Sequence, residues 1–339
     1  MIFDKLAAIE STEGVTPDAI SSAVLERTQP LILRGLVSSW PAVQPAEASF
    51  EELGSYLSKF WNDRPVTAYV AAPETKGRFG YNEAFNGFNF KKGSAPLEGL
   101  MERFKELNKP GGDADMSVYV GSTPVEGWLP GFLEANSLAI PGDPLINFWL
   151  GNRTTVAAHY DFPCNLACVV AGRRRFTLFP TDQVSNLYVG PIDRTPSGQP
   201  ISLVDFDEPD FQRFPRFAIA LENAQTAVLE PGDAIFIPSM WWHHVKALSV
   251  CNMLVNYWWL KRPEIVDSPF GALLHAVLSI RSLPPEQREA WRTLMEHYVF
   301  DAGQDSVSHI PEHVRGCLGE LDAQTIEQLR KEVADRLNS

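Results

Sequence analysis

The sequence predicts a mainly β protein with flanking helices, whose core is a jelly roll built from two sheets. Between residues 116 and 262, short apolar runs alternate with turns that contain Gly, Pro, Asn or Asp, which is typical of consecutive strands. On both sides of this region, apolar residues recur with a helical period instead. We therefore divide the chain into a helical and β extension at 1–115 that packs on the barrel, the jelly roll at 116–262, and a helical region at 263–339.

The extension before the jelly roll combines helical and β patterns. Residues up to about 27 are expected to be helical, with Thr16 and Pro17 at a helix start. Residues 76–91 are rich in Gly, Asn and aromatic side chains, which suits a loop over a pocket and equally a β-hairpin packed on the core. The remaining expectations for this part are strands at 30–35 and 66–70, helices at 49–60 and 97–107, and a turn at 110–115.

The jelly roll and the region after it are patterned most clearly. Strands are expected at 116–120, 146–150, 166–170, 176–179, 224–229, 234–237 and 250–260. Helices are expected after Ser268, Pro284 and Asp322, where a cap or a proline precedes an apolar stripe. These helices cannot bury all their stripes among themselves, so we expect them to cover the barrel or to pair with a second copy. We predict a homodimer through this region.

Composition narrows the classes of function. The chain has 339 residues and a formal net charge of −13, which argues against a surface for nucleic acids or anionic membranes. We find neither a secretory signal nor an apolar run long enough to span a bilayer. The four cysteines are too few for a disulfide framework, and Cys164 and Cys168 are expected to be buried thiols on one strand face. We expect a cytoplasmic protein.

The chemistry is carried by His159-Tyr-Asp161 and by a second histidine, His243 or His244, in a later apolar run. Alternate side chains of a strand share a face, so His159 and Asp161 are placed to converge while Tyr160 points away. The same alternation turns only one of His243 and His244 inward. Two imidazoles and one carboxylate form the three-ligand face of non-haem Fe(II) oxygenases, which leaves the other coordination positions open for chemistry.

Longer stretches around these residues carry a family resemblance. They are Pro30-Leu-Ile-Leu-Arg-Gly35, Ala158-His-Tyr-Asp161, Gly172-Arg-Arg-Arg-Phe-Thr-Leu-Phe-Pro180, Val204-Asp-Phe-Asp-Glu208, Pro231-Gly-Asp-Ala-Ile-Phe-Ile-Pro-Ser-Met-Trp-Trp-His-His244 and Val255-Asn-Tyr-Trp258. Together they resemble the JmjC and cupin-like 2-oxoglutarate oxygenases, and among these the asparaginyl hydroxylase that inhibits hypoxia-inducible factor. The spacing from Gly232 through Pro238 matches the second sequence motif of cupin barrels at His243, so we choose His243 as the third ligand.

The resemblance implies a double-stranded β-helix that holds Fe(II) through His159, Asp161 and His243. It also implies 2-oxoglutarate as a cosubstrate that chelates the metal, dioxygen as the oxidant, and hydroxylation of a C–H bond with release of succinate and CO₂. In the similar hydroxylase a lysine binds the distal carboxylate of 2-oxoglutarate, and Arg174 stands at the matching position. A guanidinium can bind a carboxylate through two parallel hydrogen bonds, so an arginine in place of the lysine is chemically reasonable.

Further residues match positions near the cosubstrate in the family. Asn165 and Asn256 match asparagines, Tyr119 matches a hydroxyl donor to the distal carboxylate, and Trp258 matches a residue beside the iron. One position departs from the pattern, because Val156 replaces a threonine that contacts the cosubstrate. Thr154 or Thr155 would replace that threonine only if the strand changed its register.

Three other functions remain compatible with this pattern. The barrel of a binding or scaffold protein would keep the shape without turnover. A different cupin enzyme, such as a Zn- or Mn-dependent isomerase or a dioxygenase without cosubstrate, would more typically carry His-x-His and a glutamate in place of Asp161. Lysine demethylation is possible within the family, although no basic surface accompanies the barrel. The sequence leaves the substrate open among a protein side chain, a peptide and a small molecule.

Overall fold

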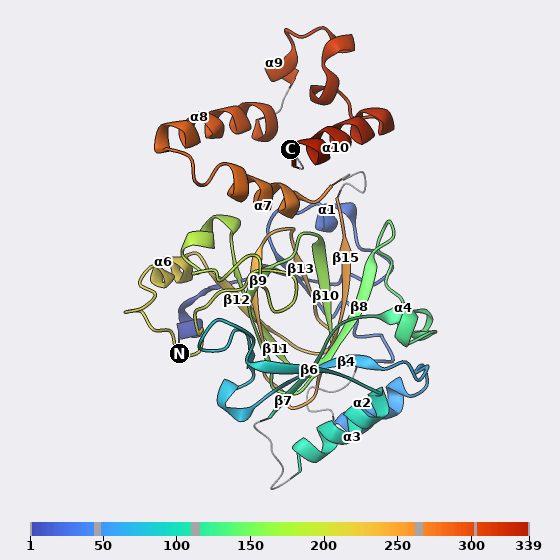
Figure 1. Cartoon of the computed structure of the whole chain (residues 1–339). Helices are drawn as coiled ribbons and strands as arrows, with labels where there is room; N and C mark the ends of the chain where they lie inside the picture. Colours follow the sequence, from blue (N-terminus) through green and yellow to red (C-terminus); the bar gives the residue numbers. More distant parts are fainter. Residues whose placement is uncertain (1, 44–48, 110–115, 262–266, 302–303, 338–339) are drawn as a thin grey trace. The chain divides into compact units, whose positions relative to one another are not determined.

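The structure, a computed structural model, describes residues 2–43, 49–109, 116–261, 267–301 and 304–337 (Figure 1). The chain divides into two compact units, Met1–Lys261 and Arg262–Ser339. Within the described ranges, no helix combines the length and apolar character needed to cross a bilayer.

The first unit is built on two sheets, as expected of a jelly roll. The smaller sheet has the strand order β1 (Ala7–Ala8), β12 (Gln225–Leu229), β11 (Arg174–Phe179), β14 (Trp242–Ala247), β9 (Thr155–Tyr160), β5 (Arg78–Phe79). The larger sheet has the order β2 (Ser11–Glu13), β3 (Leu31–Arg34), β13 (Ala234–Ile237), β10 (Cys164–Ala171), β15 (Asn252–Trp259), β8 (Leu145–Gly151), β7 (Ser117–Pro124), β4 (Val66–Ala71), β6 (Phe90–Ala95). The predicted mainly β class with flanking helices is confirmed.

Strand alternation sorts side chains between the interior and the outer faces of the sheets. Along β10, Cys164 and Cys168 point away from the other sheet, into the core between the larger sheet and the two helices that cover it. Both thiols are buried, as predicted. Ala167 and Val169 point inward, where they meet Phe176 of the facing sheet. Because both faces of β10 are covered, all of its residues are buried.

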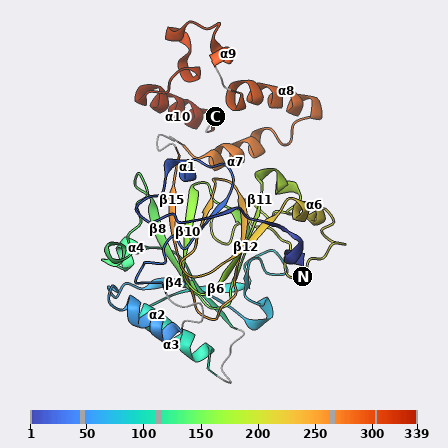
Figure 2. The same cartoon turned by 180° about the vertical axis from the view of Figure 1, so that it is seen from behind.

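The two helices that cover the larger sheet lie where the sequence predicts them. Helix α2 (Phe50–Leu57) begins at Ser49, whose hydroxyl accepts a hydrogen bond from the backbone N–H of Glu52 and completes a capping box. Helix α3 (Leu97–Leu107) packs against it through stacked rings of Phe50 and Phe104, whose centroids lie 4.2 Å apart. Both views place this pair beside β4 (Figures 1 and 2). The shorter helices are α1 (Ser22–Leu25), α4 (Val125–Trp128), α5 (Phe132–Ala135) and α6 (Phe217–Glu222).

The predicted N-terminal helix is wrong over most of its length. After a 3₁₀ turn, η1 (Ile2–Lys5), the chain forms β1 and β2, and only α1 is helical in this region. Strand β1 pairs in parallel with β12, and β2 pairs in parallel with β3, so each short strand covers an edge of one sheet. Pairing with the sheets and burial of Ile9 between them outweigh the weak helical preference of the isolated segment.

Residues 76–91 were expected to form either a loop over a pocket or a β-hairpin packed on the core, and the segment has features of both. After the 3₁₀ turn η2 (Pro73–Thr75), strand β5 joins the smaller sheet and β6 joins the larger one, with a bridge between Tyr81 and Phe88 in the hairpin that connects them. The rings of Phe79 and Phe90 lie 5.6 Å apart, centroid to centroid, and both face the cavity described below. The turn expected at 110–115 lies outside the described residues.

The second unit is helical. It contains α7 (Pro269–Ser279), α8 (Pro285–Met295), the π-helical turn η4 (Glu296–Phe300), α9 (Gln304–Val307), the 3₁₀ turns η5 (Glu312–Val314) and η6 (Gly316–Leu318), and α10 (Ala323–Leu337). Ser268 caps α7 through a hydrogen bond from the backbone N–H of Gly271, and Asp322 accepts one from Thr325 at the start of α10. Among its described residues, none is buried.

The turn at Gly232 and Asp233 ties the jelly roll to the N-terminal extension. Gly232 has a φ of +97°, and a Cβ at this position would lie 2.5 Å from Ser38 Oγ, so only glycine fits without strain. The buried Asp233 carboxylate accepts hydrogen bonds from the Arg34 guanidinium at 2.6 Å, from the Gly35 N–H at 2.9 Å and from the Glu230 N–H at 3.1 Å.

Replacing Asp233 by alanine is expected to lower the free energy of unfolding by about 3 kcal/mol, because it leaves several donors without their acceptor. Glu208→Ala is the control, since it removes an exposed ion pair with Lys76 and should change stability by less than about 0.5 kcal/mol. Urea denaturation followed by circular dichroism measures both. Equal stabilities of the two variants would contradict the role of Asp233.

Candidate metal centre

The ligand positions follow from the pairing of two adjacent strands in the smaller sheet. His159 lies near the end of β9, and Asp161 is the first residue after this strand. His243 lies opposite His159 on β14 in the antiparallel register. The imidazole ring centroids are 4.2 Å apart, and His243 Nε2 lies 3.5 Å from Asp161 Oδ2. One ligand atom from each of the three residues lies within 4.8 Å of the others. The structure therefore brings together the three residues chosen from the sequence.

Backbone carbonyls orient both imidazoles. His159 Nδ1 lies 2.9 Å from Ala157 O, and His243 Nδ1 lies 3.0 Å from Trp241 O. A proton on Nδ1 donates to each carbonyl, which leaves the Nε2 lone pairs free to bind a metal. Burial, with a smaller contribution from His159, lowers the pKa of His243 to about 4, so this ring is neutral at physiological pH. This donor set fits Fe(II).

His244 faces the other side of the sheet. Its ring stacks on Phe206 with centroids 4.4 Å apart, and burial lowers its pKa to about 3. Its Nδ1 has no hydrogen-bond partner among the described residues. Strand alternation thus separates the two neighbouring histidines, with only His243 directed to the other ligands.

A β-bulge shapes the wall beside the metal centre. His243 pairs with His159 and Val245 pairs with Val156, so two residues of β9 lie opposite the single residue His244. The bulge lets both His159 and Val156 face the cavity, although three positions separate them. Thr155 is buried, and its N–H donates to Gly77 O at 2.8 Å. The structure therefore keeps an apolar side chain at the position where the sequence departs from the family.

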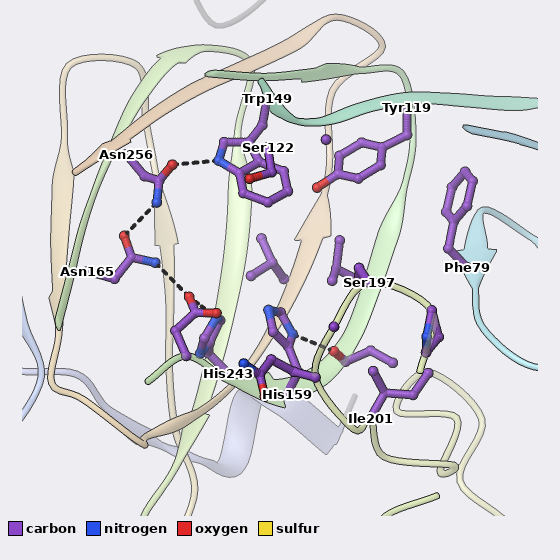
Figure 3. Close-up of a pocket in the computed structure, with 18 of the residues that line it drawn as sticks. Phe79, Tyr119, Ser122, Trp149, His159, Asn165, Ser197, Ile201, His243 and Asn256 are labelled. Carbon is purple, nitrogen blue, oxygen red and sulfur yellow. Dashed lines mark hydrogen bonds and ion pairs between the residues drawn. The ribbon is translucent and has the colours of Figure 1, made fainter. Parts of the chain in front are cut away.

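Hydrogen bonds fix the carboxylate ligand. Trp258 Nε1 donates to Asp161 Oδ2 at 3.2 Å, and Asn165 Nδ2 donates to the same oxygen at 3.3 Å. Asn256 then donates to Asn165 Oδ1 at 3.3 Å and accepts from Trp149 Nε1 at 2.7 Å (Figure 3). The chain of donors leads from strand β8 to the metal centre. Sequence reasoning missed Trp149, because an indole in an apolar strand looks like ordinary core.

The triad opens into a cavity of about 660 Å³ between the two sheets. Figure 3 shows Tyr119 on the opposite side of this cavity from the two histidines, with its hydroxyl pointing inward. Arg174 also lines the cavity and is only 4% exposed. Burial lowers the pKa of Arg174 to about 10, which leaves it charged at neutral pH, and burial raises the pKa of Tyr119.

The rest of the lining contains residues that the sequence did not single out as functional. Rings from β4, β5 and β6 form an aromatic wall, and Lys92 places its ammonium 5.5 Å from the centroid of the Tyr69 ring. Residues 196–199 line another side of the cavity. The missed lining residues with aromatic or charged side chains are Tyr69, Phe79, Phe90, Lys92, Trp149, Phe162 and Phe176. They come from distant segments, so sequence proximity gives no sign of their common location.

Comparison with known proteins agrees with this geometry. A model of the cupin-like domain matches residues 17–265. The chain belongs to this cupin-like, JmjC-related family. Lysine-specific demethylase JMJ31 of Arabidopsis thaliana is 30% identical over 232 residues, which cover 62% of this chain and 40% of that protein. HSPB1-associated protein 1 of Homo sapiens is 24% identical over 269 residues, which cover 74% and 51%. The tRNA wybutosine-synthesizing protein 5 of Danio rerio is 32% identical over 152 residues, which cover 40% and 44%.

Membership of this family indicates which cofactors the protein uses. JmjC and cupin-like proteins are Fe(II)- and 2-oxoglutarate-dependent oxygenases, and this chain has the corresponding metal-binding triad. The chain spans about half the length, or less, of the curated relatives compared above.

His243→Ala is expected to weaken Mn(II) binding by at least about a hundredfold, because loss of a ligand should exceed the effect of losing a supporting hydrogen bond. His244→Phe is the matched control, since it keeps a ring on Phe206 and removes no ligand. Electron paramagnetic resonance of free Mn(II) measures both affinities. Equal losses in the two variants would show that His243 is not the ligand.

Proposed function

We propose that the protein is an Fe(II)- and 2-oxoglutarate-dependent oxygenase that hydroxylates an unactivated C–H bond. The observation that carries this proposal is a two-histidine, one-carboxylate centre that opens into the same cavity as a buried arginine. When bound, Fe(II) with 2-oxoglutarate supplies activation of dioxygen coupled to oxidative decarboxylation, with succinate and CO₂ as co-products.

The protein's own residues then have separate tasks. His159, Asp161 and His243 would hold the metal by one face and leave the other coordination positions to cosubstrate and dioxygen. The donors Asn165 and Trp258 hold Asp161 in position. Such supporting hydrogen bonds tune ligand orientation, and their loss commonly weakens metal binding.

Arg174 supports 2-oxoglutarate as the cosubstrate. Its Nε has no hydrogen-bond partner among the described residues, and the part of the chain that the structure describes shows no ion pair for it. A buried charge without a counter-ion is costly, and a bound ligand of opposite charge would offset that cost. Arg174 and the Tyr119 hydroxyl together would bind the distal carboxylate of 2-oxoglutarate.

Apolar side chains would keep water from the reacting centre. Val156, Phe176, Val245 and Leu254 line the cavity from both sheets. Electrostatic interactions with Arg174 are stronger in such surroundings than in water. Exclusion of water also protects a reactive centre from side reactions.

Removal of N-methyl groups is the second candidate reaction, because hydroxylation of a methyl carbon next to nitrogen is the same C–H chemistry. The aromatic wall around Tyr69, Phe79 and Phe90 favours it, since aromatic rings attract alkylammonium groups. The name of the Arabidopsis relative, a lysine-specific demethylase, points the same way. Lys92 in the same wall opposes it, because one cation repels another.

Arg174→Ala is expected to raise the KM for 2-oxoglutarate on the order of a hundredfold, because it removes the charge partner of a buried carboxylate. Arg173→Ala is the control, since Arg173 is the exposed residue directly before Arg174. Anaerobic titration of the Fe(II) protein measures 2-oxoglutarate binding through the metal-to-ligand charge-transfer band, and aerobic succinate release measures turnover. If the wild type shows neither the band nor succinate release, the oxygenase proposal is wrong.

We also infer that the second unit, which includes residues 263–339, mediates a homodimer. Its helices leave large apolar side chains exposed, including Leu278 and Phe300 at 75% each. Leu273, Trp291 and Phe300 line a hollow of about 450 Å³ within this unit. Burying such side chains in a second copy would contribute roughly 25 cal/mol for each Å² of apolar surface removed from water.

The double variant Leu278→Asp, Trp291→Asp is expected to be monomeric, because charges on these faces oppose burial. Gln328→Glu on α10 adds a charge at an exposed polar position and should leave the dimer intact. Multi-angle light scattering over a range of concentrations measures the mass. A wild type that stays at 37.8 kDa at every concentration would rule out the dimer.

A further inference from the structure

The charges that line the cavity are unbalanced at its mouth. Among the described residues of the lining, Asp161 is the one carboxylate, and it is already engaged by the metal centre and by Asn165 and Trp258. The cations of the lining are Arg174 and Lys92. Within the described part of the chain, Lys92 forms no ion pair, and its ammonium contacts the ring of Tyr69.

Lys92 and Arg174 occupy different depths. Lys92 pairs with Tyr69 on β4, and Tyr69 pairs with Tyr119 on β7, so the three form a row across adjacent strands. At the spacing of β-strands, Lys92 lies roughly 10 Å from Tyr119. Lys92 is exposed at the cavity mouth, whereas Arg174 is buried.

Occupation of the metal centre does not neutralise Lys92. The charges of a divalent ion, of Asp161, of Arg174 and of a dianionic 2-oxoglutarate cancel one another. Lys92 is then the charge left over on the surface that faces an incoming substrate. A cationic substrate meets repulsion there, and an anionic one meets attraction.

The strand that carries Lys92 also has an open edge. β6 is the last strand of the larger sheet, and its only partner strand in the described structure is β4 (Figure 1). Residues 91–94 are exposed, and no strand of the described structure pairs with the outer side of β6. An open edge binds extended peptides by main-chain hydrogen bonds, and alternate side chains then select the sequence.

The geometry points to an extended acidic peptide as the substrate, paired with the outer edge of β6, with Lys92 binding a carboxylate close to the residue that enters the cavity. This inference rests on the oxygenase function proposed above. Alternation directs Lys91 to the opposite face, so Lys92 is the lysine of this strand that reads the substrate. A methylated lysine fits poorly, because the described lining offers its ammonium no free carboxylate.

A random peptide library tests this inference. The wild type, loaded with Fe(II) and 2-oxoglutarate in air, should oxidise members enriched in Asp and Glu near the oxidised residue and depleted in Lys and Arg. Lys92→Glu should reduce the preference for acidic over basic members by about tenfold, as expected for reversal of one partly exposed charge. Lys91→Glu, with the same charge change on the other face, should leave the preference unchanged. Mass spectrometry of the products identifies the oxidised members.

A binding measurement separates recognition from turnover. Anisotropy of the preferred peptide, labelled with a fluorophore and mixed with Mn(II) protein without oxygen, should show about tenfold weaker binding to Lys92→Glu than to Lys91→Glu. Enrichment of basic or methylated residues, or equal behaviour of the two variants, overturns the inference. A normal charge-transfer band with no peptide oxidised overturns the peptide substrate alone. A wild type without this band overturns the oxygenase function and this inference together.

Discussion

The pairing of β9 with β14 is the constraint on which the site depends. Its register places His243 directly opposite His159, and the bulge across from His244 lets Val156 face the same cavity. A slip of one residue would turn His244 inward and move His243 into the core around Phe206. Such a slip would also bury two mismatched faces, because β14 is covered on both sides. The packing of the sheet therefore fixes the geometry of the metal centre.

The same two-sided burial explains how the ligands are kept ready for a metal. Burial keeps the His243 imidazole neutral, and the carbonyl of Trp241 holds its proton on Nδ1. Asp161 is held in place differently, because Asn165 and Trp258 donate hydrogen bonds to its Oδ2. Burial therefore sets the protonation of the His243 ring, and hydrogen bonds fix the orientation of the Asp161 carboxylate.

Local patterns in the sequence were sufficient where periodicity and spacing determine the structure. The run from Gly232 to His243 contains both the turn and the start of the strand, so its spacing selected the histidine that the structure places beside His159 and Asp161. The helix prediction for the N-terminal residues was wrong because this segment forms strands by pairing with β12 and β3, which are distant from it in sequence. Trp149 and Lys92 were missed for a related reason. Trp149 matters through its hydrogen bond to Asn256, and Lys92 through its position on the cavity, and neither contact can be read from the local sequence. Single-strand patterns show which face is buried but not what it meets.

The two cations of the cavity show how burial assigns different tasks to similar charges. Arg174 is almost completely enclosed, so burial makes its charge costly and a small dianion bound beside it would offset that cost. Lys92 is hydrated at the mouth, where an unpaired charge costs little and a partner adds moderate affinity. The inner cation therefore suits a cosubstrate that every turnover requires, and the outer one suits a substrate that must also leave. Exchange of their positions would bind the substrate too tightly and the cosubstrate too weakly.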